Sequence, residues 1–247
     1  MIILVDIGNS NIVITRYDGK SFSTPYRYNT DKTKSVDEYF VLLKDIIFDA
    51  KGIIISSVVP ELNVIIKNVV KKYLNMDPLF VGPGVKTGIR IITDNPKEVG
   101  SDLVCSAASV IENYADTAII VDMGTATTFT YIENKVIKGV AISTGLVTQK
   151  DALVGKASQL SQFEFKTPTK ILGTNTNDSL NAGLIFGNAL MIKGMVDKIK
   201  SEYKTEPKVI ITGGASRFVK DTLKEYDFIF DDLLLLKGLL VIYNKNI

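Results

Sequence analysis

The chain has 247 residues, which is enough to bury the core of one large domain or two smaller ones. Its hydrophobic fraction of 46% and charged fraction of 23% are ordinary for a globular protein, and its formal net charge of +2 gives no electrostatic case for nucleic acid binding. Cys105 is the single cysteine and there is no histidine, so an intrachain disulfide, Ser-His-Asp catalysis and a His-ligated zinc site are all excluded.

The first strand is expected at the N-terminus, where the apolar run from Met1 meets a charge at Asp6. This stretch has no basic leader, so it does not resemble a signal peptide. The other apolar runs are interrupted by charges before they reach the roughly 20 residues that a membrane helix needs. We therefore expect a cytoplasmic protein with no membrane partner.

Two segments of the chain repeat one pattern. Residues 3–14 and 120–130 each predict a buried strand, an Asp-x-Gly turn with small polar residues, and a second β-rich strand, which together make a hairpin. A weaker repeat follows each hairpin: residues 53–57 and 209–214 are apolar runs that end in serine or in threonine and glycine, as expected for strands covered on both faces.

Helices are expected between these strands. Ser35 and Glu38 form a capping box ahead of an apolar stripe at helical spacing, and Pro60 lies where a second helix can begin. Residues 177–200 also predict a helix, weakened by three glycines. The fold class is therefore α/β with two similar halves: an N-terminal lobe of residues 1–115 with the first loop and Asp102, and a C-terminal lobe of residues 116–247 with the second loop and the Gly213–Gly214 turn.

An Asp at the end of a buried strand, followed by a glycine turn, suits nucleotide phosphates. Backbone N–H groups of such a turn can point at phosphate oxygens, and the carboxylate can hold Mg²⁺, usually through water. Asp6 and Asp122 are the candidates, with Asn9, Ser10, Thr125 and Thr127 as neutral donors. The alternative is a pair of ordinary Asx-type hairpin turns, which the repetition of the motif disfavours.

Other segments leave alternatives open. Gly213-Gly214 could let an adenine or ribose lie against bare backbone, or could simply turn the chain from strand to helix. Asp102, near the start of a predicted helix, is by itself better explained as a cap. Residues 81–88 resemble a phosphate loop in composition but fit neither the G-x-x-x-x-G-K-[ST] nor the G-x-G-x-x-G spacing. Lys86 in this segment could face a substrate, but a solvated side chain is the simpler interpretation.

The order of the motifs resembles type III pantothenate kinases over essentially the whole chain. The motifs are Asp6-Ile7-Gly8-Asn9-Ser10-Asn11, Ile55-Ser56-Ser57-Val58-Val59-Pro60, Val81-Gly82-Pro83-Gly84-Val85-Lys86-Thr87-Gly88, Asp94-Asn95-Pro96 with Glu98-Val99-Gly100-Ser101-Asp102, Asp122-Met123-Gly124-Thr125-Ala126-Thr127-Thr128, Gly173-Thr174-Asn175-Thr176 and Lys237-Gly238-Leu239.

The resemblance implies two ribonuclease-H-like lobes of the actin/Hsp70/sugar-kinase superfamily, with ATP in the cleft between them. It implies phosphorylation of pantothenate to 4′-phosphopantothenate, the first step of coenzyme A synthesis, with ATP, Mg²⁺ and K⁺ or NH4⁺ as cofactors. It also implies a homodimer with shared active sites, formed through helices of the C-terminal lobe.

The resemblance also assigns roles to residues. Asp102 becomes the general base, which at a reference pKa of ~3.9 would already be ionised at neutral pH. Asp122 would hold the monovalent cation, Asp6 would lie near Mg²⁺, and Thr176 would reach the partner's substrate site. The expected ATP-binding residues are Asp6, Ile7, Gly8, Asn9, Ser10, Asn11, Ile12, Val13, Thr125, Gly213 and Gly214, and the expected substrate-binding residues are Thr93, Gly100, Ser101, Asp102, Leu103 and Thr176.

Three departures from the family pattern fall on the acceptor side. Leu103 stands where the family usually has arginine, Thr93 where it commonly has tyrosine, and residues 143–145 replace its Ala-Pro-Gly segment. An arginine offers a carboxylate-bearing substrate a fixed fork of donors. Lys150 or Arg90 could replace it in a variant pantothenate kinase, which we favour, or the acceptor could be another small hydroxyl compound.

Other classes of function remain as alternatives. The chain could be a non-catalytic nucleotide-binding accessory or regulatory protein, although its near-neutral charge argues against direct DNA contact. It could also be a phosphatase or ATPase on the same fold, which would release ADP without any added alcohol.

Overall fold

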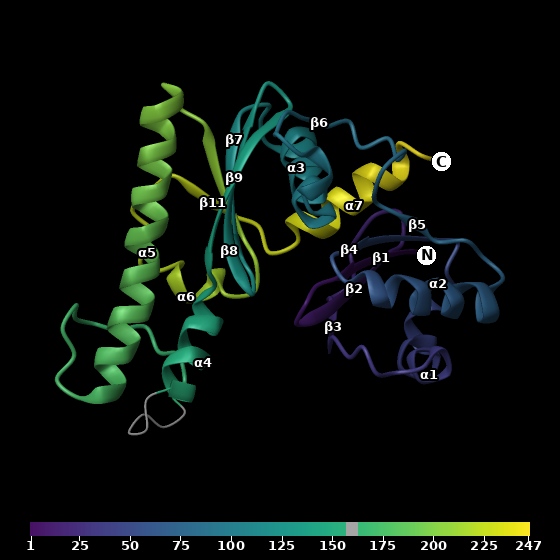
Figure 1. Ribbon diagram of the computed structural model, residues 1–247, viewed down its shortest axis with the longest axis horizontal. Helices are drawn as coiled ribbons and strands as arrows, with labels where there is room; N and C mark the ends of the chain where they lie inside the picture. The colour runs from purple at the N-terminus through teal and green to yellow at the C-terminus, as the bar shows by residue number, and fades with distance from the viewer. Residues whose placement is uncertain (157–162) are drawn as a thin grey trace. The chain divides into compact units, whose positions relative to one another are not determined.

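The computed structural model describes residues 1–156 and 163–247, and the chain divides into two compact units (Figure 1). Unit 1 holds residues 1–90, 94–113 and 234–247, and unit 2 holds residues 91–93 and 114–233. The sequence-based division at residues 115/116 differs from this mainly in the last helix, which that division assigns to the C-terminal lobe. That helix packs with unit 1.

Unit 1 is built on a five-stranded sheet with the order β3-β2-β1-β4-β5. Its strands are β1 (Ile2–Ile7), β2 (Asn11–Tyr17), β3 (Tyr26–Asn29), β4 (Gly52–Ser57) and β5 (Leu79–Phe80). The expected hairpin is present, because β1 pairs antiparallel with β2, while β4 lies parallel to β1 on its other side.

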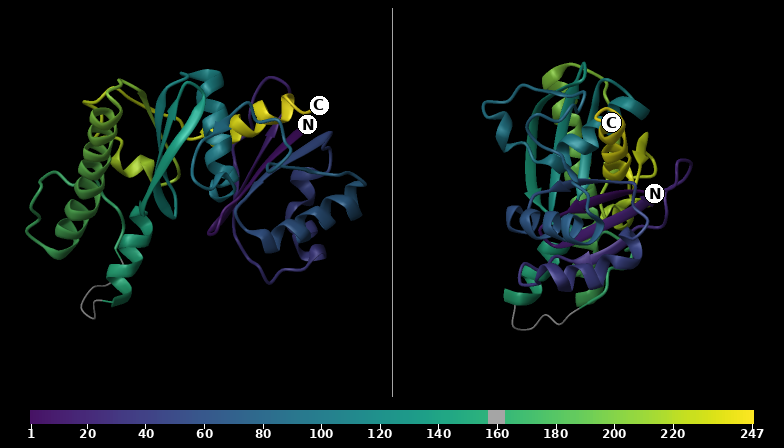
Figure 2. Two further views of the ribbon diagram at one scale, coloured as in Figure 1. Left: turned by 45° about the horizontal axis from the view of Figure 1, so that its top comes forward. Right: turned by 90° about the vertical axis from the view of Figure 1, so that its right-hand side faces the viewer.

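Helices cover both faces of this sheet, because successive residues of a strand point to opposite faces. The alternate residues Ile3, Val5 and Ile7 join a hydrophobic core with α1 (Val36–Ile47) and α2 (Pro60–Leu74), which lie on one side of the sheet in Figure 2. The residues between them face α3 (Ser101–Asn113) and α7 (Leu234–Asn244); α7 contacts β1 and β4, and α3 contacts β4. A short helix, η1 (Pro96–Glu98), precedes α3.

The helix starts predicted for unit 1 are confirmed. The Ser35 side chain accepts a hydrogen bond from the N–H of Glu38, and the Glu38 side chain accepts one from the N–H of Ser35, which completes the capping box of α1. Pro60 occupies the first turn of α2, where its missing N–H costs nothing.

Unit 2 is built on a six-stranded sheet with the order β11-β10-β7-β8-β9-β6. Its strands are β6 (Arg90–Ile91), β7 (Ala118–Met123), β8 (Ala126–Glu133), β9 (Val136–Thr144), β10 (Lys208–Thr212) and β11 (Phe228–Phe230). Again the predicted hairpin is present: β7 pairs antiparallel with β8 and parallel with β10.

One face of this sheet is covered by α4 (Leu146–Lys156), α5 (Thr176–Tyr203) and α6 (Ser216–Val219). The helix predicted at residues 177–200 is therefore confirmed as α5. By length and composition α5 could cross a membrane, but Ile185, Ile192 and Val196 are buried in unit 2, which is the behaviour of a core helix.

The two last helices of unit 1 cross at very short range. A Cβ added to Gly238 of α7 would collide with the backbone carbonyl of Cys105 on α3. Backbone atoms inside a packed helix cannot move aside as the end of a flexible side chain can. The crossing of α3 and α7 therefore requires glycine at this position.

We expect Gly238→Ala to lower the free energy of unfolding by about 1–3 kcal/mol or more, because the added methyl group overpacks the helix crossing. Urea unfolding followed by far-UV circular dichroism measures this change. Gly155→Ala in α4 is the matched control, since its added Cβ meets nothing within 4 Å. Equal unfolding midpoints for Gly238→Ala and the wild type would show that the crossing is not tight.

Candidate functional site

The first Asp-Gly loop lies at the end of β1 in unit 1. The N–H of Gly8 donates to the carbonyl of Asn11 at 2.9 Å and closes the hairpin, and Asn9 and Ser10 are exposed at its tip. The side chains of Ile7 and Ile12 lie in the hydrophobic core, so these two positions can offer a ligand only their backbone.

A residue that the sequence did not single out braces this loop. The hydroxyl of Thr30 donates to the carbonyl of Gly8 at 2.6 Å, and the N–H of Thr30 donates to the carbonyl of Ser10 at 3.0 Å. Thr30 follows β3 and is distant in sequence from the loop. No local motif signals its role.

Asp6 and Asp102 lie in the same unit, near the same buried thiol. Asp6 is directly beside Ser56 in the parallel register of β1 and β4, and Asp102 is in the first turn of α3. Burial raises the pKa of the Cys105 thiol well above its ordinary value, and the negative charges of Asp6 and Asp102 raise it further, against a hydrogen bond with Ser56 that lowers it. Unit 1 thus gathers two carboxylates around the start of α3.

The Asp102 carboxylate is half-buried and accepts a hydrogen bond from the N–H of Leu103 at 2.9 Å. Burial raises its pKa above the ordinary value, and this backbone hydrogen bond lowers it by a smaller amount. A carboxyl group with a raised pKa is a stronger base than an exposed one when it is ionised. Asp102 is preceded in the sequence by Gly100 and Ser101 and followed by Leu103, at the beginning of α3.

The second Asp-Gly loop lies at the end of β7 in unit 2 and is one residue shorter than the first. Residues 124–126 separate the last paired residues of β7 and β8, whereas residues 8–11 separate those of β1 and β2. The carbonyl of Thr125 accepts from the N–H of Gly145 at 3.1 Å and from the hydroxyl of Thr148 at 2.8 Å. Neither bracing residue was expected from the sequence.

Gly213 lies directly against the second loop. It has a φ of +90°, and a Cβ there would collide with the Asp122 carboxylate and lie 2.6 Å from the N–H nitrogen of Met123. Thr212 is paired with Asp122 in the parallel register of β10 and β7. Unit 2 therefore brings the loop that holds Asp122 and Thr125 together with the Gly213–Gly214 turn, and the nucleotide site at this place stays a prediction.

An oxygen without a hydrogen bond lies across the ladder from Asp122. Thr128 is the antiparallel partner of Asp122, so the two side chains are on the same face of the sheet. Within residues 1–156 and 163–247, the buried hydroxyl of Thr128 has no hydrogen-bond partner. A carboxylate and a hydroxyl oxygen on one face are suitable ligands for a hard cation.

The remaining predicted residues lie elsewhere in unit 2. Thr93 precedes Asp94, where the chain returns to unit 1. Thr176 is the first residue of α5 and follows the cap Asn175, whose side chain accepts a hydrogen bond from the N–H of Asp178. The ammonium of Lys150 lies over the rings of Phe163 and Phe165, 5.2 and 5.3 Å from their centroids.

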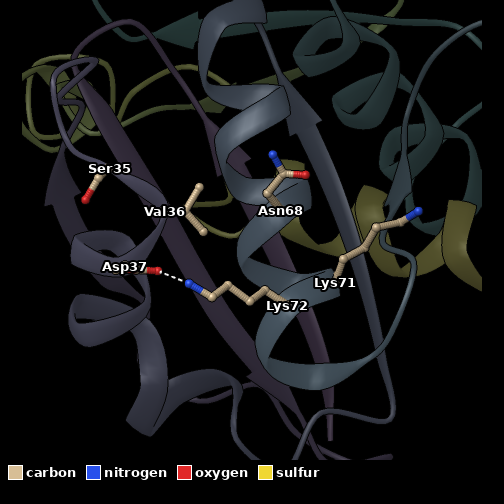
Figure 3. A pocket seen from close by; sticks show the side chains of 6 residues that line it. All are labelled: Ser35, Val36, Asp37, Asn68, Lys71 and Lys72. Atoms are coloured by element: carbon tan, nitrogen blue, oxygen red, sulfur yellow. Dashed lines mark hydrogen bonds and ion pairs between the residues drawn. The ribbon is translucent and has the colours of Figure 1, made fainter.

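One cavity in unit 1, of about 630 Å³, is lined by none of the predicted site residues (Figure 3). It lies between the start of α1 and the second half of α2, where Lys72 pairs with Asp37 at 2.7 Å. The neighbouring Lys71 pairs with Asp77 at 3.0 Å. Because both lysines already have carboxylate partners, the cavity has little excess positive charge to hold an anion.

The raised pKa of Asp102 predicts how Asp102→Asn changes stability with pH. The folded protein binds this proton more tightly than the unfolded chain, whose ordinary value is 3.8, so the associated stability is full below that value and is lost as the pH rises through the folded pKa. We expect the advantage of Asp102→Asn in free energy of unfolding to grow from about pH 4 to pH 7. Urea midpoints at each pH test this, and an advantage that does not grow would contradict a raised pKa.

Three comparisons with known proteins identify relatives of the whole chain. A family model for type III pantothenate kinase matches residues 2–198. The type III pantothenate kinase of Citrifermentans bemidjiense is 42% identical over 257 residues, and that of Halalkalibacterium halodurans is 39% identical over 255 residues, with 100% of both chains covered in each case. A solved structure from Campylobacter jejuni, described as a Baf family transcriptional activator, aligns with a TM-score of 0.65 at 21% identity and covers 98% of this chain and 97% of its own.

The solved structures establish the architecture alone. They are proteins with the actin-like ATPase and sugar-kinase fold, and their mixed α/β sheets in two lobes agree with the two sheets described above. The predicted fold class is confirmed.

Proposed function

This chain belongs to the type III pantothenate kinase family, and from that membership we propose that it phosphorylates pantothenate with Asp102 as the general base. The family's reaction uses ATP and supplies coenzyme A biosynthesis. The observation that supports the assignment of Asp102 is the grouping of charges in unit 1. A half-buried carboxylate with a raised pKa lies at the start of α3, and its negative charge and that of Asp6 both raise the pKa of the Cys105 thiol.

In this reaction Asp102 accepts the proton of the pantothenate hydroxyl. The hydroxyl oxygen then forms a bond to the γ-phosphorus of ATP while the bond from that phosphorus to the bridging oxygen of ADP breaks. The products are 4′-phosphopantothenate and ADP, and the proton stays on Asp102 until solvent removes it. Such a transfer depends mainly on alignment and charge neutralisation, and a positioned base contributes by removing the proton of the attacking hydroxyl.

The phosphates of ATP are proposed to lie against the first loop, residues 6–13, where backbone N–H groups and the exposed Asn9 and Ser10 are available. Asp6 would hold Mg²⁺ through water. Among the described residues no group of three acidic, His or Cys side chains lies close enough together to hold a metal ion by itself. When bound, Mg²⁺ offsets the negative charge of the phosphates.

Unit 2 is proposed to supply the rest of the nucleotide site. Asp122 would hold K⁺ or NH4⁺, and the unpartnered hydroxyl of Thr128 on the same face is a second oxygen that fits this role. Thr125 would contact ATP, and the Gly213–Gly214 turn would let the adenosine approach bare backbone.

The acceptor side is proposed to comprise Thr93, Gly100, Ser101, Leu103 and, from a partner copy, Thr176. Leu103 cannot pair with the carboxylate of pantothenate as an arginine would. Lys150 and Arg90 remain the proposed replacements. Lys150 lies over two aromatic rings, whose faces attract its ammonium without removing its charge.

A cytoplasmic homodimer is also proposed, with α5 as a contact surface. The exposed positions Gly183, Gly187, Leu190 and Gly194 recur along α5 at spacings of four, three and four residues, which places them on one face. Small residues on such a face allow two helices to approach closely. This helix face therefore fits a second copy of the chain.

Asp102→Asn is expected to lower kcat for phosphopantothenate formation by ~10²–10⁴, because an amide cannot accept the proton. ADP release in K⁺ and Mg²⁺ buffer, with and without pantothenate, measures the rate, and mass spectrometry identifies the product. Nucleotide affinity should be unchanged.

Glu112→Gln is the matched control, since it neutralises an exposed carboxylate on the same helix. It should retain the wild-type rate. An undiminished rate in Asp102→Asn would remove Asp102 from the mechanism, and wild-type ADP release that needs no pantothenate would instead favour an ATPase.

Asp122→Asn is expected to raise the K⁺ concentration that gives half-maximal activity by about 10-fold or more, since a neutral amide is a weaker ligand for a cation than a carboxylate. A K⁺ titration at constant ionic strength measures this. The control is Asp116→Asn, which removes an exposed carboxylate of the same unit that pairs with Lys135 at 3.6 Å. Identical K⁺ curves for Asp122→Asn and the wild type would place the cation elsewhere.

A further inference from the structure

The side chain of Ser101 is held by the end of a neighbouring strand. Its hydroxyl accepts a hydrogen bond from the N–H of Ser57 at 3.0 Å and donates one to the carbonyl of Ser57 at 3.1 Å. The same hydroxyl lies 3.0 Å from the hydroxyl of Ser56. All these partners belong to the last two residues of β4. One hydroxyl group therefore fastens the first residue of α3 to the carboxyl end of β4.

A second contact continues this junction one helical turn later. Residues 101 and 105 are four apart in α3, so their side chains lie on the same face of the helix. The Cys105 thiol has a hydrogen bond with the hydroxyl of Ser56, which is fully buried and lies beside Asp6 in the sheet register. Ser56 thus stands between the two α3 side chains and next to Asp6.

We propose that Ser101 is a positioning residue that sets the place of the Asp102 carboxylate relative to Asp6 by fastening α3 to β4. This inference rests on the proposed function, in which Asp102 is the base and Asp6 lies near the phosphates. In this role the Ser101 hydroxyl bonds to β4 and does not bind the substrate, although Ser101 belongs to the segment proposed to line the acceptor site.

The geometry gives the reason why the carboxylate follows the helix. The Asp102 carboxylate accepts from the N–H of Leu103, within its own helical turn, so it moves with the start of α3. Removing the Ser101 hydroxyl leaves the buried end of β4 without three contacts and releases that turn. A displacement of about 1 Å in a reacting group can lower a rate by as much as 10²-fold.

The proposal separates two roles by their kinetics. A hydroxyl that binds pantothenate would, on removal, raise KM with little change in kcat. A hydroxyl that positions the base lowers kcat and leaves KM for ATP unchanged. We expect Ser101→Ala to lower kcat by about 10- to 100-fold.

Two variants control for loss of packing. Ser109→Ala removes a hydroxyl that is fully buried on the same helix and has Asn113 as its partner, so it should keep the wild-type kcat. Ser101→Thr retains a hydroxyl at the same position and should recover most of the rate lost in Ser101→Ala. A wild-type kcat in Ser101→Ala, or an equal loss in Ser109→Ala, would overturn the proposal.

The effect should also pass through Asp102. In the Asp102→Asn background the base is already absent, so adding Ser101→Ala should change the residual kcat by less than about twofold. Multiplication of the two separate losses would show that Ser101 acts independently of Asp102, and would overturn the positioning role.

Cys105 provides a readout that needs no turnover. It is the only cysteine in the chain and is fully buried beside Ser56, so the rate at which 4,4′-dithiodipyridine modifies the native protein reports on the junction of α3 with β4. Ser101→Ala should accelerate this reaction severalfold, whereas Ser109→Ala and Ser101→Thr should react at nearly the wild-type rate. Equal rates for Ser101→Ala and the wild type would overturn the fastening itself.

These measurements separate the two hypotheses. If the wild type fails to form phosphopantothenate, the proposed function is overturned, and with it the role of Asp102 as the base that Ser101 positions. Normal wild-type turnover with an unaffected Ser101→Ala would overturn only the role of Ser101.

Discussion

The structure of each unit depends on the parallel register between its central strand and the neighbouring one. In unit 1 this register sets Asp6 beside Ser56, and in unit 2 it sets Asp122 beside Thr212. Because the carboxyl ends of parallel strands share one edge of a sheet, each Asp-Gly loop opens next to a second strand end. That second strand end carries the serines that hold α3 in one unit and the glycine turn against Asp122 in the other.

The repeated elements could be predicted because their signals are local. Alternating apolar residues, the Asp-x-Gly turns, the capping box of Ser35 and Glu38, and Pro60 each act within a few residues. The position of α7 could not be predicted in this way. Its buried residues Leu236, Leu239 and Ile242 show that it packs in a core but not which of two sheets it covers, and that choice depends on the close crossing at Gly238.

The candidate site residues were chosen from the same kind of local signal. Asp6, Asp122 and Asp102 stand out because a charged residue follows a buried strand or begins a helix. Thr30, Gly145, Thr148 and the bonding of Ser101 to β4 were not predicted, because each depends on a contact between segments that are far apart in sequence. The two loops also proved unequal in length, although their sequences are similar at the Asp and Gly positions.

One departure from the family pattern, Leu103, lies directly beside Asp102 at the start of α3. Leu103 lacks the charge that the family has there, yet its backbone N–H still holds the Asp102 carboxylate. The backbone contact depends on the helix and not on the side chain, so it survives the substitution. In the proposed function, the place of the base at residue 102 therefore does not depend on which side chain stands at residue 103 on the acceptor side.

The path of the chain has a consequence for its synthesis. Unit 1 is made from both ends of the chain, with residues 114–233 of unit 2 between its parts. The apolar face of α3 and the sheet residues beneath α7 therefore stay uncovered on the ribosome until residues 234–247 emerge. Unit 2, by contrast, is nearly continuous in sequence, so all but its residues 91–93 come from one stretch that emerges before the last helix of unit 1.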